Sequence, residues 1–129
     1  MRGKFIDTNV ALRLLDGGPK ADRAEAILAQ GSRISVHVLS EALVNCRRKS
    51  GLGRDETDRF LAALIALCPV EDLTPRTHEI GRSLSERYGF SVHDAMIVAA
   101  ALVSGCDTLY SEDMHDGLLE QLRLANPFA

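Results

Sequence analysis

The chain has 129 residues and a mass of 14.0 kDa, a size typical of one domain. Its content of 46% hydrophobic and 26% charged residues is average for globular proteins and argues against disorder. No apolar run approaches the roughly 18 residues of a membrane span, and the first residues lack the apolar stretch of a secretory signal. We therefore expect residues 1–129 to form a single soluble domain in the cytoplasm, with no membrane partner.

The net charge of −3 is unevenly distributed along the chain. Residues 1–60 hold 11 Lys and Arg against 8 Asp and Glu, whereas residues 61–129 hold 4 against 10. Such a balance lacks the overall positive field through which strongly basic proteins attract nucleic acid. A polyanionic ligand would therefore have to be held by a local basic patch or through a metal ion.

The first half of the chain alternates short apolar runs with helical patterns. Residues 4–6 form an apolar run that predicts a buried strand ending at Asp7, and Asn9 is a suitable cap for a helix over residues 10–15. The following patterns predict a helix over residues 20–30, a strand over 34–38, a helix over 40–51 and a helix over 55–69.

The second half continues the same alternation. Thr74 and Pro75 mark a helix start after a strand over residues 70–73, and Gly89 ends that helix. Ser91 and Asp94 resemble a capping box ahead of an apolar helix that ends near residue 103. A strand over residues 107–110 and a short helix over 118–122 complete the prediction. Strands alternating with helices predict an α/β fold, with a central parallel sheet of four to five strands flanked by helices on both faces.

Four acids fall at positions that such a sheet brings together. Asp7 follows the first strand and Asp113 follows the last, while Glu41 and Asp94 lie in the predicted first turns of two helices. In an open α/β sheet, ligands bind outside the carboxyl ends of the strands, where these helices begin. We therefore expect these four side chains, called the acid quartet below, to converge on one edge of the sheet.

Each acid also has an ordinary explanation, as a helix cap, a partner of the helix dipole or a turn residue. Asp7 is the exception, because it ends a strand that a parallel sheet buries, and a buried carboxylate must be paired or bind a cation. Crowded carboxylates repel one another unless a hard divalent cation such as Mg²⁺ or Mn²⁺ lies between them. A site of this kind predicts metal-assisted hydrolysis of a phosphodiester.

Four short pieces occur in order along the chain: Phe5-Ile6-Asp7-Thr8-Asn9-Val10, Ser40-Glu41-Ala42, Ser91-Val92-His93-Asp94-Ala95 and Leu109-Tyr110-Ser111-Glu112-Asp113-Met114. This ordered set covers nearly the whole chain and resembles the PIN-domain ribonucleases, most closely the VapC-type toxins of bacterial toxin–antitoxin pairs. The resemblance implies a PIN-like α/β/α sandwich, Mg²⁺- or Mn²⁺-dependent endoribonuclease activity on RNA and a cognate antitoxin. Homodimers are usual in the family.

The resemblance also implies roles for particular residues. Asp7, Glu41, Asp94 and Asp113 would be the catalytic acids, and Asp7, Asp94, Asp113 and Asp116 would hold the metal. Glu41 would orient or deprotonate the attacking water. Small polar residues would support these acids, namely Thr8, Asn9 and Ser111.

Basic and apolar residues suggest where RNA and an antitoxin would bind. The run Arg47-Arg48-Lys49, with Arg54 nearby, would hold RNA phosphates or would simply form a solvated helix end. Arg13 has the same two interpretations. The apolar faces of residues 10–15 and 24–28 would form a groove for an antitoxin helix or would pack on the sheet.

The cysteines and histidines carry no motif of their own. The three cysteines are an odd number without close spacing, which favours neither a disulfide framework nor a cysteine zinc site. His37 lies in a predicted strand, and we expect all four histidines to be structural or surface residues that do not form a set, including His78, His93 and His115.

Two other functions remain open from the sequence. One is a phosphoacceptor or phosphatase domain with Asp7 as the nucleophile, although the second acid that such a phosphatase needs two residues later is Asn9 here. The other is a catalytically silent PIN-like binding module, against which the presence of all four acids weighs.

Overall fold

Short strands and longer helices alternate along the chain, as the apolar pattern predicts. The computed structural model describes residues 3–48 and 51–129. The elements in chain order are β1 (Lys4–Ile6), α1 (Thr8–Leu12), the 3-10 helix η1 (Arg13–Leu15), α2 (Gly18–Ala29), β2 (Ile34–Ser35), α3 (Val36–Arg48), α4 (Arg54–Leu67), β3 (Val70–Glu71), α5 (Pro75–Tyr88), α6 (Val92–Val103), β4 (Thr108–Tyr110), β5 (Gly117–Leu119) and β6 (Leu122–Ala125).

The strands form two ladders that meet beside β1. The larger ladder has the order β1-β4-β6-β5, in which β1, β4 and β6 are parallel and β5 runs antiparallel to β6. The smaller ladder pairs β2 with β3 in parallel. Backbone hydrogen bonds join the two, because Arg33 donates to the carbonyl of Lys4 and accepts from the amide of Ile6. The α/β prediction is confirmed, but the sheet is mixed rather than wholly parallel.

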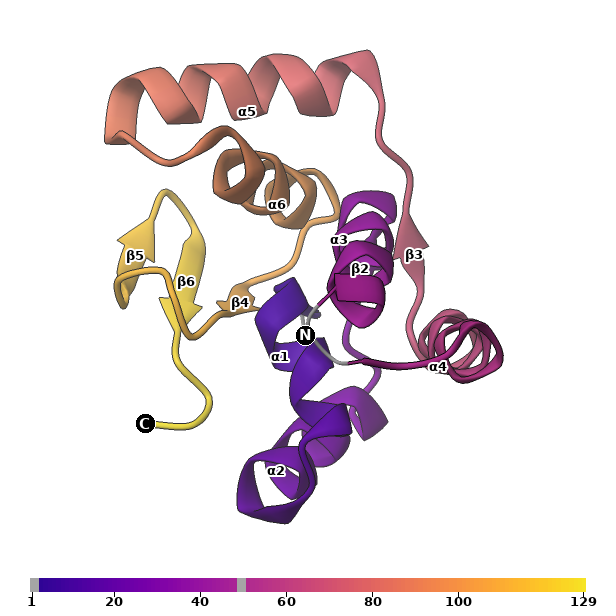
Figure 1. Ribbon diagram of the computed structural model, residues 1–129. Coiled ribbons are helices and arrows are strands. Elements are labelled where there is room, and N and C mark those ends of the chain that lie inside the picture. The colour runs from indigo at the N-terminus through magenta and orange to yellow at the C-terminus, as the bar shows by residue number, and fades with distance from the viewer. Residues whose placement is uncertain (1–2, 49–50) are drawn as a thin grey trace.

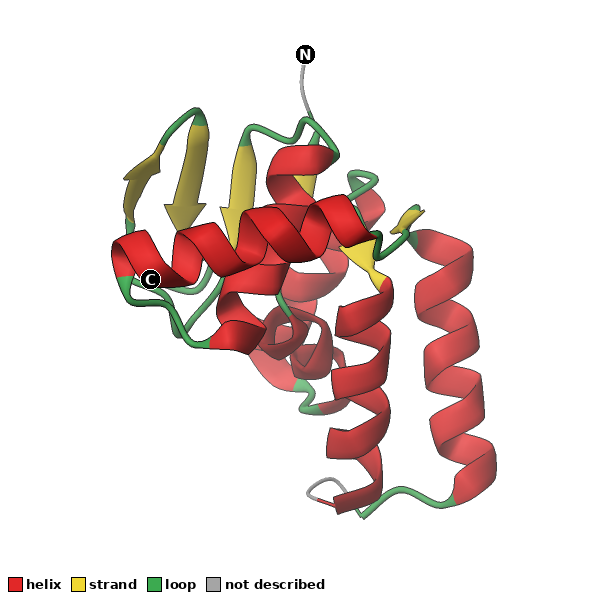
Figure 2. Ribbon diagram, turned by 90° about the horizontal axis from the view of Figure 1, so that it is seen from above, coloured by secondary structure: helices red, strands yellow, loops and turns green. Residues whose placement is uncertain are grey.

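Helices cover both faces of the strands, and the core lies between these layers. Figure 1 shows α5 and α6 above the row of strands and α1 and α2 below it. Figure 2 shows α3 and α4 side by side, extending away from the sheet. Phe5 and Ile6 on β1 have no solvent exposure, as expected of an apolar strand that is covered on both faces.

The α6 helix is buried along most of its length and is apolar around its circumference. It packs closely against α5, where a Cβ on Gly81 would lie 2.7 Å from the sulfur of Met96. A side chain at position 81 would therefore displace the Met96 side chain where the two helices meet. None of the helices in residues 3–48 and 51–129 has both the length and the apolar character needed to cross a membrane.

The strand predicted over residues 34–38 is wrong in its second half. Only Ile34–Ser35 is extended, and α3 begins at Val36. The hydroxyl of Ser35 accepts a hydrogen bond from the amide of Val38 at 3.3 Å, as a capping side chain does. Glu41 therefore lies in the second turn of this helix rather than in the first, and His37 lies in a helix rather than in a strand.

Two helix ends also differ from the prediction. Asp7, and not Asn9, caps α1, because its carboxylate accepts the Thr8 amide at 2.7 Å. The helix predicted over residues 40–51 ends at Arg48 as far as the structure describes it. Lys49, which belongs to the predicted basic run, lies outside the described residues.

The helix predicted over residues 118–122 is a β-hairpin. Leu119 on β5 pairs with Leu122 on β6 across a two-residue turn. Glu120 adopts a left-handed backbone with a φ of 55° in this turn. Two-residue hairpin turns usually contain glycine or asparagine, whereas Glu120 and Gln121 occupy this turn.

Candidate functional site

The acid quartet lines one open cavity of about 280 Å³. The side chains come from the end of β1, from α1 and α3, from the first turn of α6 and from the loop after β4. Seven of the eight lining residues are polar and none is basic, and together they are Asp7, Thr8, Asn9, Leu12, Glu41, Asn45, Asp94 and Asp113. This cavity is called the acid cavity below.

Asp7 is the buried member of the quartet, with 5% of its surface exposed. Its Oδ1 accepts the Thr8 amide and its Oδ2 accepts the Ser111 hydroxyl, each at 2.7 Å. Burial raises the pKa of Asp7 to about 6, and the negative charges of Asp94 and Glu41 add to this effect against the two hydrogen bonds. No basic side chain in the part of the chain that the structure describes pairs with this carboxylate, so its negative charge is costly in the absence of a cation.

Glu41 on α3 is oriented by a hydrogen bond from a side chain of α1. The hydroxyl of Thr8 donates a hydrogen bond to Glu41 Oε1 at 2.7 Å. The side-chain amide of Asn45, one turn further along α3, donates to the backbone carbonyl of Glu41 at 2.9 Å. The Thr8 contact orients one carboxylate oxygen of Glu41, whereas the Asn45 contact is made to the backbone.

Asp94 lies in the first turn of α6. Its backbone amide donates to the hydroxyl of Ser91, the capping residue that the sequence predicts. Burial raises the pKa of Asp94, and the charges of Glu41 and Asp113 raise it further against a hydrogen bond with Ser91. The mutual influence of these acids on their pKa values shows that they share one electrostatic environment.

Asp113 is the exposed member of the quartet and is held by two polar neighbours. The side-chain amide of Asn9 donates to Asp113 Oδ2 at 2.9 Å. The backbone amide of Asp113 donates to the hydroxyl of Ser111 at 3.3 Å. Thr8, Asn9 and Ser111, which the resemblance places beside the acids, therefore each donate a hydrogen bond to one of them.

Arg13, which follows Leu12 of the acid cavity, binds acids outside the quartet. Arg13 binds Glu112 through two hydrogen bonds, at 2.6 and 3.1 Å, and binds Asp16 at 2.8 Å. These carboxylates raise the pKa of the Arg13 guanidinium above its ordinary value. Arg13 is thus a partner of Glu112, and it does not neutralise the quartet.

The donor set of the acid cavity has the chemistry that a hard divalent cation requires. Carboxylate, hydroxyl and amide oxygens are the ligands of Mg²⁺ and Mn²⁺, which prefer octahedral sites that retain water. A cavity of about 280 Å³ leaves room for such water. A bound cation would also remove the cost of the buried charge on Asp7.

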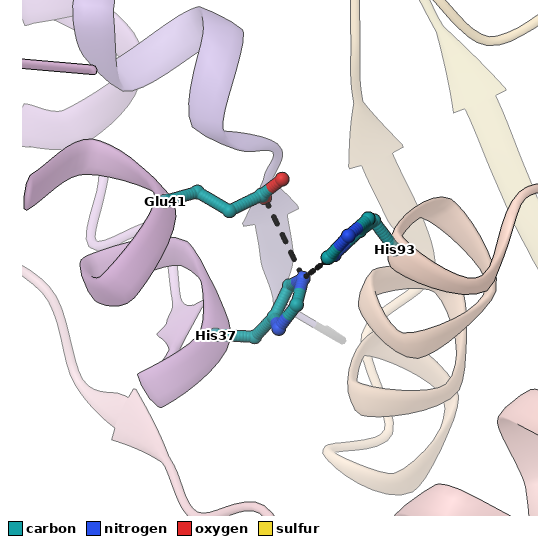
Figure 3. Close-up of side chains that lie close together, drawn as sticks. All are labelled: His37, Glu41 and His93. Carbon is teal, nitrogen blue, oxygen red and sulfur yellow. Dashed lines mark hydrogen bonds and ion pairs between the residues drawn. The ribbon is translucent and has the colours of Figure 1, made fainter. Parts of the chain in front are cut away.

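Within the described residues, a tighter group of potential metal ligands lies beside the quartet. One ligand atom from each of His37, Glu41 and His93 lies within 4.8 Å of the others. His93 Nδ1 is 3.1 Å from His37 Nε2, which is 3.7 Å from Glu41 Oε1 (Figure 3). The expectation that the histidines do not form a set is therefore wrong. These three residues are called the histidine cluster below.

The sequence did contain a signal for this cluster. His37, Glu41 and Asn45 are spaced four residues apart, which places them on one face of a helix. That face is apparent only if the helix begins at Val36. Burial lowers the pKa of His37, against the charge of Glu41, and His93 lowers it further.

Two predicted features lie away from the acid cavity. Asp116 is not among the residues that line it, and its carboxylate accepts the backbone amide of Asn126 at 3.0 Å. The idea that Asp116 holds a metal thus rests on the sequence alone. Arg47 and Arg54 line a separate cavity of about 160 Å³ at the far end of α3.

Comparisons with known proteins identify the family and the fold of the chain. Residues 4–116 match the family model of the PIN domain. No curated protein matches the chain by sequence. Similar solved structures include a toxin–antitoxin complex from Klebsiella pneumoniae, with a TM-score of 0.75 and 17% identity over 97% of this chain and 98% of that one.

Two further structures have the same fold. The DNA-bound VapBC of Salmonella typhimurium gives a TM-score of 0.75 at 17% identity, over 98% of this chain and 99% of that one. The toxin VapC20 of Mycobacterium tuberculosis, described as cleaving the sarcin–ricin loop, gives 0.64 at 22% identity over 86% and 90%. At these identities the likeness concerns the fold, while the family match spans most of the sequence. The chain therefore belongs to the PIN-domain family.

Proposed function

We propose that this protein is a divalent-metal-dependent endoribonuclease and the toxin of a toxin–antitoxin pair. The observation that carries the proposal is the acid cavity, where four carboxylates from distant parts of the chain meet and, among the described residues, no basic side chain belongs to the lining. A buried carboxylate such as Asp7 is stabilised in this setting by a cation. Membership of the PIN-domain family supports metal-dependent cleavage of RNA as the chemistry of that cavity.

The quartet divides into residues that hold the cation and one that acts on water. Asp7, Asp94 and Asp113 would hold Mg²⁺ or Mn²⁺. When bound, the ion supplies positive charge that polarises a phosphoryl oxygen and stabilises the leaving oxygen. Ser111 and the Thr8 amide orient the Asp7 carboxylate, and Asn9 orients Asp113, so the ligands are positioned in advance.

Glu41 is the best-placed general base. Thr8 engages its Oε1, so Oε2 would be the oxygen that accepts a proton from a water in the acid cavity. General bases must lie within hydrogen-bond reach of the proton they remove, and Glu41 lines the same cavity as the three acids. Its role would be to orient and deprotonate the attacking water.

Basic residues on α3 provide a route for the RNA backbone. Arg47 and Arg48 are exposed in the last turn of the helix that carries Glu41. With 5% aromatic residues, the chain has little surface for stacking bases, so phosphate contacts and RNA shape would guide binding. The sarcin–ricin loop activity stated for VapC20 supports a structured RNA as the substrate class.

An antitoxin is the expected protein partner. Similar folds were crystallised within toxin–antitoxin complexes, including the ones from Klebsiella pneumoniae and Salmonella typhimurium. An antitoxin arginine inserted among the quartet would bind carboxylates bidentately and exclude the cation. The apolar face of α2 is buried in the core at Ala24, Ile27 and Leu28, which favours packing over an open groove there. The half-buried Leu12 and Leu14 remain as contacts for an antitoxin helix. Homodimerisation stays an expectation from the family.

The decisive experiment is cleavage of total RNA by the purified chain with Mn²⁺ and with EDTA. We expect metal-dependent cuts by the wild type, and a loss of most activity in Asp7→Asn with the fold retained. The matched control is Asp72→Asn, because Asp72 also follows a strand but is exposed and does not line the acid cavity. Equal cleavage by Asp7→Asn and the control would contradict the proposal.

Two further measurements on the same protein, phosphate release and RNA binding to a filter, separate the two alternative functions. A phosphatase with Asp7 as its nucleophile would release phosphate from a monoester without cutting RNA internally. A silent binding module would retain RNA on a filter without cutting it under either condition. Mapping the 5′ ends of cellular RNA after expression of the chain would then identify the cut site.

A further inference from the structure

The histidine cluster consists of side chains from two helices that meet beside the acid cavity. His37 and Glu41 are one turn apart on α3, and His93 lies in the first turn of α6. Figure 3 shows the three side chains pointing toward one another, with His37 in the middle. We propose that His37, His93 and Glu41 form a second cation site, specific for a borderline transition ion such as Zn²⁺.

The spacing of the donor atoms is close to that of a four-coordinate site. Ligand atoms about 2.0–2.1 Å from a tetrahedral ion lie roughly 3.3–3.4 Å from one another. The two imidazole nitrogens are 3.1 Å apart, and His37 Nε2 is 3.7 Å from Glu41 Oε1. The two imidazole rings stack, with centroids 5.1 Å apart and planes 27° apart, so the exposed His93 ring would have to rotate to direct its nitrogen at a shared ion. His93 and Glu41, the third pair, have ligand atoms within 4.8 Å of each other, so rotation of the exposed His93 side chain would be needed to bring three protein ligands to one ion, with water in the fourth position.

The chemistry of this site differs from that of the acid cavity. Imidazole nitrogen is a preferred ligand of Zn²⁺, Co²⁺ and Ni²⁺, whereas carboxylate and water oxygens suit Mg²⁺ and Mn²⁺. Thr8 donates a hydrogen bond to the same Glu41 oxygen that faces His37, which orients this carboxylate as an outer partner orients a metal ligand. The two adjacent sites would thus select different ions by their donor atoms.

Glu41 belongs to both sites, and this has a consequence for activity. An ion held by His37, His93 and Oε1 of Glu41 would withdraw negative charge from this carboxylate, and its Oε2 would then be a weaker base toward the attacking water. Zinc would then inhibit cleavage, a consequence that rests on the proposed function. The binding of the ion itself does not depend on it.

The test is a titration of the full chain with Co²⁺, a spectroscopic substitute for Zn²⁺, in an excess of Mg²⁺ and without RNA. Four-coordinate Co²⁺ with nitrogen ligands absorbs visible light strongly, whereas six-coordinate Co²⁺ among carboxylates and water absorbs weakly. We expect one strongly absorbing equivalent, which added Zn²⁺ removes. His37→Gln and His93→Gln should each weaken binding about tenfold or more. His78→Gln and His115→Gln, at exposed histidines outside the cluster, should bind as the wild type does.

Asp7→Asn distinguishes the two sites, because it alters the acid cavity and leaves the histidine cluster intact. We expect this variant to keep the strong absorption. Loss of the absorption in Asp7→Asn with retention in His37→Gln and His93→Gln would place the ion among the carboxylates and overturn the proposal. Weak absorption in the wild type would overturn it too. Because no RNA is present, neither result depends on whether the chain is a nuclease.

Discussion

The hydroxyl of Ser111 donates a 2.7 Å hydrogen bond to Asp7 Oδ2, joining residues 104 positions apart in the chain. Both side chains are buried, with 1% and 5% of their surfaces exposed. The same hydroxyl accepts the backbone amides of Asp113 and Met114 at 3.3 and 3.4 Å. Ser111 therefore couples the orientation of Asp7 to the loop that carries Asp113.

Replacing Ser111 by alanine is expected to reduce both stability and cleavage. The change leaves Asp7 without its side-chain donor, and a lost buried hydrogen bond to a charged group costs about 1.5–3 kcal/mol. The pKa of Asp7 should rise further, because a hydrogen bond that favours the charged form is removed. Chemical denaturation and RNA cleavage measure the two effects. Ser83→Ala, at an exposed serine on α5, is the control, and equal behaviour of the two variants would contradict this role.

Asp7→Asn is expected to stabilise the protein in EDTA while it removes cleavage. Raising the pKa of Asp7 from 3.8 to about 6 corresponds to a cost of about 3 kcal/mol for the ionised group at neutral pH. Asparagine carries no charge and caps a helix as well as aspartate does, and its NH₂ group could donate to the Ser111 oxygen that now donates to Asp7. For a chain of this size, 1 kcal/mol shifts Tm by about 3–5 °C. Thermal unfolding should therefore show a Tm at least about 5 °C higher, whereas Asp72→Asn should leave Tm unchanged.

The raised pKa of Asp7 also predicts how stability depends on pH without a divalent cation. The native state binds a proton at Asp7 more tightly than the unfolded state does, so protonation favours folding. This contribution is fully present below the unfolded pKa of about 3.8 and is lost as the pH rises through about 6. The free energy of unfolding of the wild type should thus increase, relative to Asp7→Asn, between pH 7 and pH 5. Parallel curves for the two proteins over this range would contradict the burial of an ionisable Asp7.

Divalent cations are expected to stabilise the wild type and not Asp7→Asn. A ligand that binds only the native state adds about 1.4 kcal/mol at ten times its Kd. In the wild type it also offsets the repulsion among Asp7, Glu41 and Asp94. Tm should rise with Mg²⁺ or Mn²⁺ concentration and return to its starting value in EDTA. A similar rise in Asp7→Asn would show that the cations bind elsewhere.

The sequence predicts the acid quartet better than it predicts the histidine cluster, and the reason is topological. The carboxyl ends of β1 and β4 share one edge of the sheet because the strands are parallel, so Asp7 and Asp113 are neighbours whatever the detailed packing. The position of His37 depends on where a single helix begins. Residues 34–38 alternate as a strand does, yet Ser35 also suits a helix cap, and local sequence does not decide between these two tendencies.

Local sequence also fails to predict the C-terminal hairpin, for a related reason. Leu118 and Leu122 have the spacing of a helix, and no glycine or asparagine occupies the turn between β5 and β6. The pairing of β6 with β4 provides hydrogen-bond partners that a local pattern does not reveal. Tertiary contacts therefore outweigh helical propensity in this segment.

Zinc is expected to inhibit RNA cleavage in the presence of saturating Mg²⁺. Glu41 Oε1 lies 3.7 Å from His37 Nε2, and an ion shared by these atoms would make the Glu41 carboxylate a weaker base toward the attacking water. Cleavage by the wild type should fall at least about tenfold, which corresponds to about 1.4 kcal/mol in the activation barrier. His93→Gln should tolerate the same zinc concentration, measured against its own zinc-free rate, whereas His78→Gln should be inhibited like the wild type. Equal inhibition of His93→Gln and His78→Gln would mean that zinc acts by displacing Mg²⁺ from the acid cavity, and Glu41 would then have no shared role.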